Sequence, residues 1–343
     1  MKLLSIVIPS YNSEKYISQC LKSLLIGRDD ELDVIVVNDG STDNTSKIAH
    51  KFADEHSFVR VVDKPNAGHG SGVNVGIELA KGLYFKILDS DDLLDEEGLL
   101  HLLDNIKKNN EKNNNPDLYM ADYCSYPENS NTYNARISFQ KHMKKLEEVV
   151  SWVGLPRIGI TDFFMIHMCY VKTKLLQDNH VELLERTFYE DNQFMFYVLI
   201  YTKTLCYLTK PIYKYTVGRK GQSISLENMS KKYEHQHRVM RSMIEAINYD
   251  DYKKMHKHQR FEIRHDLSKI AMLTYFYTYI GTGKERHRKY KSTLRYFKNT
   301  NPKMYRIWRR EVGANIMLMW IPPLRHQIVK IGYKIFAERK GWK

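Results

Sequence analysis

Short apolar runs alternate with helical patterns along the first part of the chain, up to about residue 125. The apolar runs occupy residues 4–8, 34–37, 59–62, 84–88 and 118–121. Between them, apolar residues recur at helical spacing, as in Ile17, Leu21 and Leu24. This spacing predicts helices, and short runs rich in Val and Ile between polar turns predict strands. Because the alternation is typical of β-α-β units, we predict an α/β fold with a mostly parallel sheet flanked by helices.

The alternation weakens after residue 140. Residues up to 225 mix polar segments with short apolar runs such as 205–208, and residues 228–300 place His, Lys and Arg on polar helical faces. We therefore predict a sheet-containing part, residues 1–225, followed by a helical C-terminal region, residues 226–343. The histidines of that region, His237 among them, lack the grouping of a metal site, and we expect them on the surface.

Cysteine usage and hydropathy indicate the compartment. Four cysteines are spread through 343 residues with no C-x-x-C pair, so neither a zinc knuckle nor a disulfide framework is indicated. The N-terminal apolar run stops at Pro9 and is too short for a signal-peptide core, and no stretch reaches the ~20 apolar residues of a membrane-spanning helix. These observations predict a cytoplasmic protein.

Positive charge is concentrated near the C-terminus. The formal net charge is +13, and residues 284–343 carry 17 Lys and Arg against three Glu, so the preceding chain is close to neutral. This distribution predicts a basic appendage on a neutral body rather than a protein that is basic throughout. In residues 316–336, apolar positions are interleaved with Arg325, Lys330 and Lys334. Such an amphipathic segment fits either peripheral contact with an anionic membrane or a terminal helix packed on the body.

Polar side chains follow the predicted strands where each one ends. Asp89, Asp91 and Asp92 come directly after the apolar run 84–88. Ligands of open parallel sheets bind at the carboxyl ends of the strands, and Mg²⁺ or Mn²⁺ is held there by one or two carboxylates plus phosphate oxygens. A metal-bridged phosphate substrate is therefore the first hypothesis. A solvated turn with a helix N-cap explains the same residues without a ligand.

Three longer motifs carry a family resemblance. The segments 5–12, 36–43 and 88–92 read SIVIPSYN, VVNDGSTD and LDSDD, and their order and spacing resemble those of family 2 inverting glycosyltransferases with the GT-A nucleotide-sugar fold. The resemblance covers the first ~125 residues strongly and continues less tightly to about residue 225. It implies a GT-A, Rossmann-like sheet and a donor that is a UDP-sugar.

The resemblance implies a nucleotide site in the N-terminal half. By position, Pro9, Tyr11 and Asp39 form the uridine pocket, and Asn66 and Gly68 keep the family's positions in a loop that contacts the donor. Asp39 taken alone fits a turn and helix cap better than a binding site. Convergence of several strand ends on one edge of the sheet favours the binding interpretation.

The resemblance also implies the catalytic groups. Asp89 binds ribose or nucleotide, Asp91 is the ligand of Mn²⁺ or Mg²⁺, and Asp92 adds to the donor-sugar site. Asp191 matches the family's general base, which takes the proton from the acceptor hydroxyl during inversion. Acidic residues also favour the first turn of a helix, so Asp191 taken alone fits a helix start.

Two further positions concern the diphosphate. Arg219 and Ser223 fall where relatives carry a loop that closes over it, although a solvated basic loop fits them as well. Val73 departs from the pattern, because many relatives have Arg there. His69, Lys86 or Arg219 is then a candidate for the missing positive charge.

The sequence therefore predicts a metal-dependent transferase that moves one sugar from a UDP-sugar to a glycan acceptor, with a lipid-linked acceptor as one option. We expect no nucleic-acid partner, and the helical region fits a dimer interface as readily as a lid. A nucleotidyltransferase is the main alternative, but the Ser10 to Ser13 segment lacks the Gly-rich basic loop of that class. A basic nucleic-acid-binding protein would leave the Asp clusters unexplained.

Overall fold

The computed structural model describes residues 1–128, 130, 132–154, 164–218, 226–280, 284–317 and 331. The chain divides into two compact units. The first comprises Met1–Pro156, Phe164–Arg186 and Tyr201–Val217, and the second comprises Arg157–Phe163, Thr187–Ile200 and Gly218–Lys343. The second unit thus includes Thr187–Ile200, which the sequence places in the sheet-containing part, and the domain boundary at residue 225 stays a prediction.

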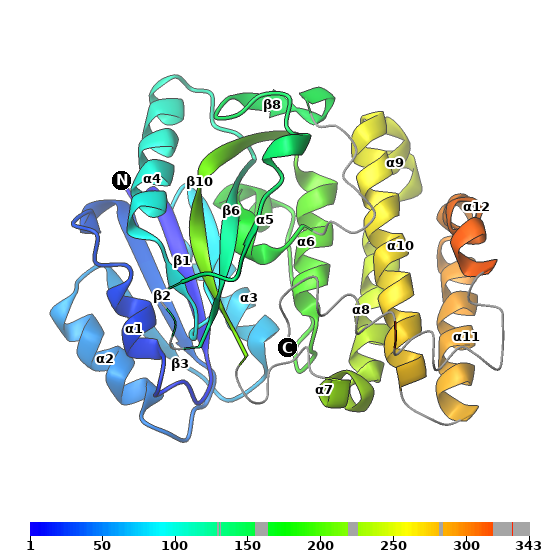
Figure 1. The fold of residues 1–343 in the computed structure, drawn as a ribbon, viewed down its shortest axis with the longest axis horizontal. Coiled ribbons are helices and arrows are strands. Elements are labelled where there is room, and N and C mark those ends of the chain that lie inside the picture. The colour runs from blue at the N-terminus through cyan, green and yellow to red at the C-terminus, as the bar shows by residue number, and fades with distance from the viewer. Residues whose placement is uncertain are drawn as a thin grey trace. The chain divides into compact units, whose positions relative to one another are not determined.

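The first unit is built on one mixed sheet, which confirms the α/β prediction (Figure 1). Its described strands are β1 (Leu4–Ser10), β2 (Leu32–Asn38), β3 (Val59–Asp63), β4 (Tyr84–Ile87), β5 (Leu93–Leu94), β6 (Leu118–Pro127), β7 (Ala135–Ile137), β8 (Val149–Ser151), β9 (Cys169–Lys172) and β10 (Thr204–Val217). They lie in the order β3-β2-β1-β4-β9-β6-β10-β5, with β7 on β6 and β8 on β10. Strands β3, β2, β1 and β4 are parallel, as are β6 and β10, whereas β9 runs antiparallel between β4 and β6.

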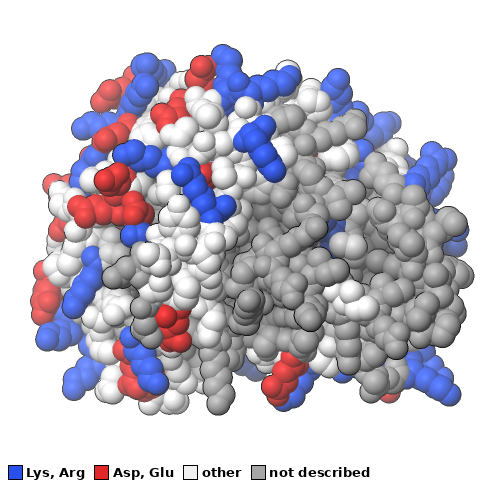
Figure 2. All heavy atoms as spheres, in the orientation of Figure 1, with Lys and Arg blue, Asp and Glu red and all other residues white. Residues whose placement is uncertain are grey.

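Helices and short 3₁₀ turns flank this sheet. They are α1 (Ile17–Lys22), η1 (Asp29–Glu31), α2 (Thr45–Glu55), α3 (His69–Leu79), α4 (Glu96–Glu111), η2 (Gln140–His142), η3 (Trp152–Gly154), η4 (Ile166–Met168) and α5 (Thr173–Asp178). Helix α3 packs closely on β1 at Gly76, where an added Cβ would lie 2.3 Å from Val7 Cγ1. Helix α4 begins at the N-cap Asp95, which accepts a 3.0 Å hydrogen bond from the Gly98 N–H. Lys and Arg are interspersed with Asp and Glu on the visible surface of this unit (Figure 2).

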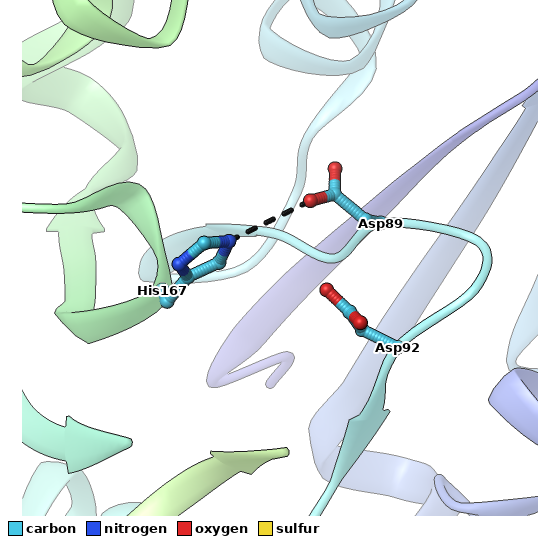
Figure 3. A group of neighbouring side chains, drawn as sticks. All are labelled: Asp89, Asp92 and His167. Atoms are coloured by element: carbon cyan, nitrogen blue, oxygen red, sulfur yellow. Dashed lines mark ion pairs between the residues drawn. The ribbon is translucent and has the colours of Figure 1, made fainter. Parts of the chain in front are cut away.

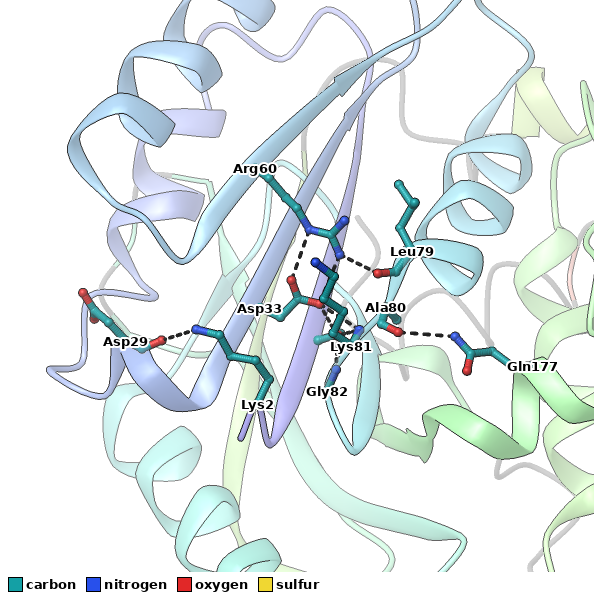
Figure 4. Close-up of polar contacts among 10 residues, drawn as sticks. Lys2, Asp29, Asp33, Arg60, Leu79, Ala80, Lys81, Gly82 and Gln177 are labelled. Atoms are coloured by element: carbon teal, nitrogen blue, oxygen red, sulfur yellow. Dashed lines mark hydrogen bonds and ion pairs between the residues drawn. The ribbon is translucent and has the colours of Figure 1, made fainter.

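A buried polar network fixes the amino ends of the first strands (Figure 4). Asp33 is 5% exposed and accepts hydrogen bonds from the Ser5 hydroxyl at 2.6 Å, the Lys81 N–H at 3.0 Å and the Arg60 guanidinium at 3.2 Å. Burial alone would raise the pKa of Asp33, but these donors lower it. Because every partner belongs to the protein, this carboxylate is structural, and it lies at the end of the sheet opposite the predicted site.

The second unit is helical in its described part, as the sequence predicts. It contains α6 (Glu190–Tyr201), α7 (Leu226–Lys231), α8 (Tyr233–Ala246), α9 (Tyr249–Lys254), α10 (Lys257–Ile280), α11 (Lys284–Thr300) and α12 (Pro302–Met317). Helices α8, α10 and α11 pack against one another (Figure 1). Among the described helices, none combines the length and hydropathy needed to span a bilayer.

His237 corrects one prediction. Its side chain is 1% exposed, with Nδ1 2.9 Å from the Thr293 hydroxyl and Nε2 3.0 Å from the Thr278 hydroxyl. Burial lowers the pKa of His237 to about 3. The sequence places His237 on a polar face, but that face is covered where α8 meets α10 and α11, so a neutral histidine lies in the interior.

Candidate functional site

The predicted uridine pocket is assembled around Asp39, directly after β2. Its carboxylate Oδ1 accepts hydrogen bonds from Lys64 Nζ at 2.6 Å and the Ala67 N–H at 2.9 Å, and Oδ2 accepts one from the Gly68 N–H at 2.7 Å. The Asn66 side chain donates to the Asp39 backbone carbonyl at 2.9 Å. Asp39 therefore ties the loop before α3 to the end of β2.

The end of β1 lies beside this loop. The Asp39 N–H donates to the Ser10 carbonyl at 2.8 Å, and Pro9 packs against α3, where a Cβ at Gly72 would lie 3.0 Å from its ring. Tyr11 is 52% exposed, so its aromatic face is accessible to a ligand. The structure thus brings the residues that the sequence assigns to the nucleotide together at one edge of the sheet. Their roles in binding stay predictions.

Asp89 follows β4 and lies between two imidazoles. His69 Nε2 is 3.2 Å from Asp89 Oδ1, and His167 Nε2 is 3.7 Å from Asp89 Oδ2. Burial would raise the pKa of Asp89, but the hydrogen bonds and charge of His167 and His69 outweigh it and hold that pKa well below its usual range. Burial lowers the pKa of His167, and Asp89 only partly offsets this effect. The two imidazoles thus favour the ionised form of the Asp89 carboxylate.

Asp92 is fully buried beneath the same turn. Its Oδ2 accepts a 2.7 Å hydrogen bond from the Tyr213 hydroxyl, and its Oδ1 accepts one of 2.7 Å from the Thr216 N–H. Burial and the neighbouring Asp89 raise the pKa of Asp92. Asp92 therefore fastens the turn to the end of β10, and its predicted contact with the donor sugar stays a prediction.

A group with metal-ligand chemistry lies at this turn (Figure 3). Asp89, Asp92 and His167 each offer one ligand atom, and these atoms lie within 4.8 Å of one another. Carboxylate oxygens suit Mg²⁺ and Mn²⁺, and imidazole is compatible with a transition metal. The Nδ1 atom of His167 is buried without a hydrogen-bond partner in the described part of the chain. Asp91, which the sequence assigns as the metal ligand, lies half-buried in the same turn but outside this group.

The structure separates the candidates for the positive charge that is absent at Val73. Val73 is fully buried in α3. Lys86 is also fully buried, with its ammonium on three backbone carbonyls, so the proposal that it contacts the diphosphate is wrong. The side chain of His69 is 34% exposed and lies in the first turn of α3. Arg219 and Ser223 lie outside the described residues.

Asp191 lies in the second unit, in the first turn of α6. Its Oδ1 accepts a 3.1 Å hydrogen bond from the Asn192 side chain. The preceding Tyr189 has a φ of 72°, which is rare for a non-glycine residue, and its ring lies 4.9 Å from that of Tyr277. A backbone held in such a conformation by packing is typical of functional segments.

Sequence reasoning missed His167, Lys64 and Tyr213. His167 lies in η4 after a region of weak periodicity, and no motif marks it. Lys64 follows β3 and had only its charge as a signal. These residues reach the site through strand order, which periodicity does not specify.

Comparisons with known proteins agree with this geometry. Residues 5–167 match the model of the family described as glycosyl transferase family 2. The chain is 27% identical over 267 residues to chondroitin synthase of Pasteurella multocida, covering 76% of this chain and 25% of that protein. It is 27% identical over 203 residues to glycosyltransferase GlyG of Streptococcus pneumoniae, covering 58% of this chain and 66% of that protein.

A solved structure shares the fold. The crystal structure of S. aureus TarS 1–349 in complex with UDP-GlcNAc superimposes with a TM-score of 0.68 at 21% identity, covering 100% of this chain and 93% of that chain. At this identity the similarity establishes the fold alone. The predicted GT-A architecture with a helical C-terminal region is confirmed.

Proposed function

Since residues 5–167 belong to glycosyl transferase family 2, we propose that the chain moves one sugar from a UDP-sugar to a hydroxyl group of a glycan acceptor, with inversion. The observation that carries the proposal is the pair of sites after β2 and β4: Asp39 with its loop for uridine, and the Asp89 to Asp92 turn for the diphosphate. The complex of S. aureus TarS with UDP-GlcNAc supports UDP as the donor nucleotide.

Separate residues bind the nucleotide, the metal and the diphosphate. Tyr11 stacks on the uracil ring, and the loop held by Asp39 fixes the position of the nucleotide. Asp91, with the group formed by Asp89, Asp92 and His167, holds Mn²⁺ or Mg²⁺. The cation, when bound, neutralises the charge that develops on the departing diphosphate. His69 supplies a donor to that diphosphate in place of the arginine that Val73 replaces.

Asp191 acts as the general base. Inversion requires that the acceptor oxygen attack from the face opposite the leaving group and lose its proton as the new bond forms. A carboxylate suffices for this step, because the oxygen becomes strongly acidic once the bond to the anomeric carbon is well advanced. The left-handed backbone at Tyr189 and its ring contact with Tyr277 support a defined start of α6, the helix that carries Asp191.

The acceptor is a saccharide, and a lipid-linked or cell-surface glycan fits the basic C-terminal region best. On α11, the exposed side chains of Arg288, Lys291, Arg295 and Lys298 recur at helical spacing and share one face. Among the described residues, none of these four forms an ion pair. We propose that this face binds anionic lipid on the cytoplasmic side of a membrane and brings the enzyme to such an acceptor.

Release of UDP from a panel of UDP-sugars tests the activity. The parent protein with Mn²⁺ is expected to hydrolyse one donor slowly, and chelation or Asp91→Ala should abolish this hydrolysis. Asp54→Ala, an exposed acidic position on α2, is the control and should leave it unchanged. No UDP release and no UDP binding by calorimetry would refute the proposal, and a nucleotidyltransferase would become the leading candidate.

A further inference from the structure

Lys86 is a lysine in the middle of the sheet. It lies on β4 and is fully buried. Its Nζ donates to the backbone carbonyls of Ile166 at 2.7 Å, His167 at 2.9 Å and Cys169 at 3.4 Å. An ammonium has three N–H donors, so these carbonyls use all of them. Lys86 therefore has no donor left for a substrate.

The carbonyls that Lys86 binds lie where η4, a single 3₁₀ turn, leads directly into β9. The Ile166 carbonyl also accepts the Cys169 N–H, so the ammonium adds to the hydrogen bonds that end this turn. The ammonium also lies 4.6 Å from the ring centroid of Tyr170 and 4.7 Å from that of Tyr213. Burial lowers the pKa of Lys86 to about 7, while Cys169, Asp89 and Asp92 act to raise it. The surroundings thus stabilise a cation that burial disfavours.

The peptide that Lys86 holds is the one that carries His167. The imidazole of His167 is packed between Tyr213, at 4.7 Å, and Tyr215, at 4.5 Å, and its Nε2 faces Asp89. The ring of Tyr213, which the Lys86 ammonium contacts, also carries the hydroxyl that bonds Asp92. Lys86 thus contacts two residues that touch the acidic turn, Asp89 to Asp92: His167 through its backbone carbonyl and Tyr213 through its ring.

We propose that Lys86 is a positioning residue: by fixing the carbonyls of η4 it sets the placement of His167 against Asp89, and so the shape of the acidic turn that receives the metal and the diphosphate. The expected effect of Lys86 on metal and diphosphate binding rests on the proposed function. Its expected effect on the conformation of the Asp89 to Asp92 turn does not.

Three variants test the proposal. Lys86→Met removes charge and donors, Lys86→Gln keeps donors without charge, and His167→Gln removes the imidazole while leaving Lys86 in place. Tyr84→Phe is the matched control, because Tyr84 lies on the same face of β4 and donates a 2.6 Å hydrogen bond to the Pro116 carbonyl, away from the turn. Thermal unfolding establishes which variants fold.

The first readout is hydrogen exchange of peptides covering residues 86–93 and 164–170, measured without ligand. Lys86→Met and His167→Gln should speed exchange in residues 88–92, and Tyr84→Phe should not. The second readout is Mn²⁺ titration followed by electron paramagnetic resonance in the presence of UDP. Loss of a residue that orients ligands should weaken Mn²⁺ binding about 10- to 100-fold. Lys86→Gln should recover part of this loss.

Equal exchange and equal Mn²⁺ affinity in Lys86→Met and Tyr84→Phe would overturn the proposal and leave Lys86 a purely structural residue. If Lys86→Met does not fold, Lys86→Gln and His167→Gln decide by the same criteria. A parent protein that binds neither UDP nor Mn²⁺ would refute the proposed function, whereas the exchange measurement would still decide whether Lys86 shapes the turn.

Discussion

The Tyr213 hydroxyl donates a 2.7 Å hydrogen bond to Asp92 across 121 residues of sequence. The same hydroxyl accepts the Asp89 N–H at 3.2 Å. One side chain of β10 therefore holds both ends of the acidic turn that follows β4. Because Asp92 is fully buried, the stability of the first unit and the geometry of the turn depend on the same contact.

Tyr213→Phe should destabilise the first unit. The variant leaves Asp92 Oδ2 buried without its hydroxyl donor, and an unsatisfied buried group costs about 1–3 kcal/mol. Urea unfolding measures the loss. Tyr126→Phe, a half-buried tyrosine on β6, is the control and should change the free energy of unfolding by less than about 0.5 kcal/mol. Equal stability of the two variants would show that the hydroxyl contributes nothing.

Asp39→Asn should weaken UDP binding. The amide places two hydrogens where the carboxylate now accepts from Lys64, Ala67 and Gly68, so at least one donor of the loop loses its partner. We expect calorimetry to give a dissociation constant for UDP about tenfold larger than that of the parent, which corresponds to a loss of about 1.4 kcal/mol in binding free energy. Asp54→Asn should bind UDP like the parent. Unchanged affinity in Asp39→Asn would remove this loop from the nucleotide site.

Asp191→Asn should abolish transfer without abolishing donor binding. General bases contribute about 10²- to 10⁴-fold to catalysis, and a loss in that range is expected in kcat for transfer to acceptor. The dissociation constant for UDP should stay within about twofold, because the base acts on the acceptor hydroxyl. Glu182→Gln, an exposed acid in the first unit, serves as the control. A fully active Asp191→Asn would exclude this residue as the base.

Asp266→Asn should stabilise the second unit at neutral pH. Asp266 is 8% exposed, and burial raises its pKa to about 6 from 3.8, with Lys269 opposing the shift. Because the pKa is higher in the folded state, the protonated carboxyl contributes to the free energy of unfolding. This contribution is fully present below pH 3.8 and is lost as the pH rises through 6. The variant cannot ionise, so its advantage should be about 1–3 kcal/mol at pH 7.5 and near zero at pH 3.5.

Free energies of unfolding at several pH values from 3.5 to 7.5 give this difference. Asp251→Asn is the matched control, since Asp251 is exposed on α9 beside Lys254. Its difference from the parent should vary little across the same range. A pH-independent advantage of Asp266→Asn would contradict burial as the cause.

Charge reversal on α11 tests the membrane proposal. The triple variant Arg288→Glu, Lys291→Glu, Arg295→Glu should lose flotation with vesicles containing phosphatidylglycerol, because each basic residue near such a surface contributes about 1 kcal/mol. Reversal of Lys107, Lys108 and Lys112 at the end of α4 changes the net charge equally and should not affect flotation. Equal loss in both variants would mean that net charge alone governs binding.

Local patterns were sufficient for the strands and their polar ends. The run 84–88 predicts β4, and the Asp residues that follow it do form the acidic turn. Helix α4 continues to Glu111 through Asn109 and Asn110, because tertiary packing overrides weak helix propensity. The predictions of a surface position for His237 and of a diphosphate contact for Lys86 were wrong for a related reason. The residues that surround these two side chains come from distant segments of the chain.

The sequence by itself determined the alternation of strands and helices, the carboxylates after β2 and β4, and the resemblance to family 2 glycosyltransferases, because each depends on residues that are neighbours along the chain. Only the tertiary structure decided that β9 lies antiparallel between β4 and β6. This arrangement places the His167 imidazole against Asp89 and the His167 backbone carbonyl on Lys86. Strand order depends on the packing of the whole sheet. A histidine or lysine therefore acquires its partner, its charge state and its role only when the sheet is complete.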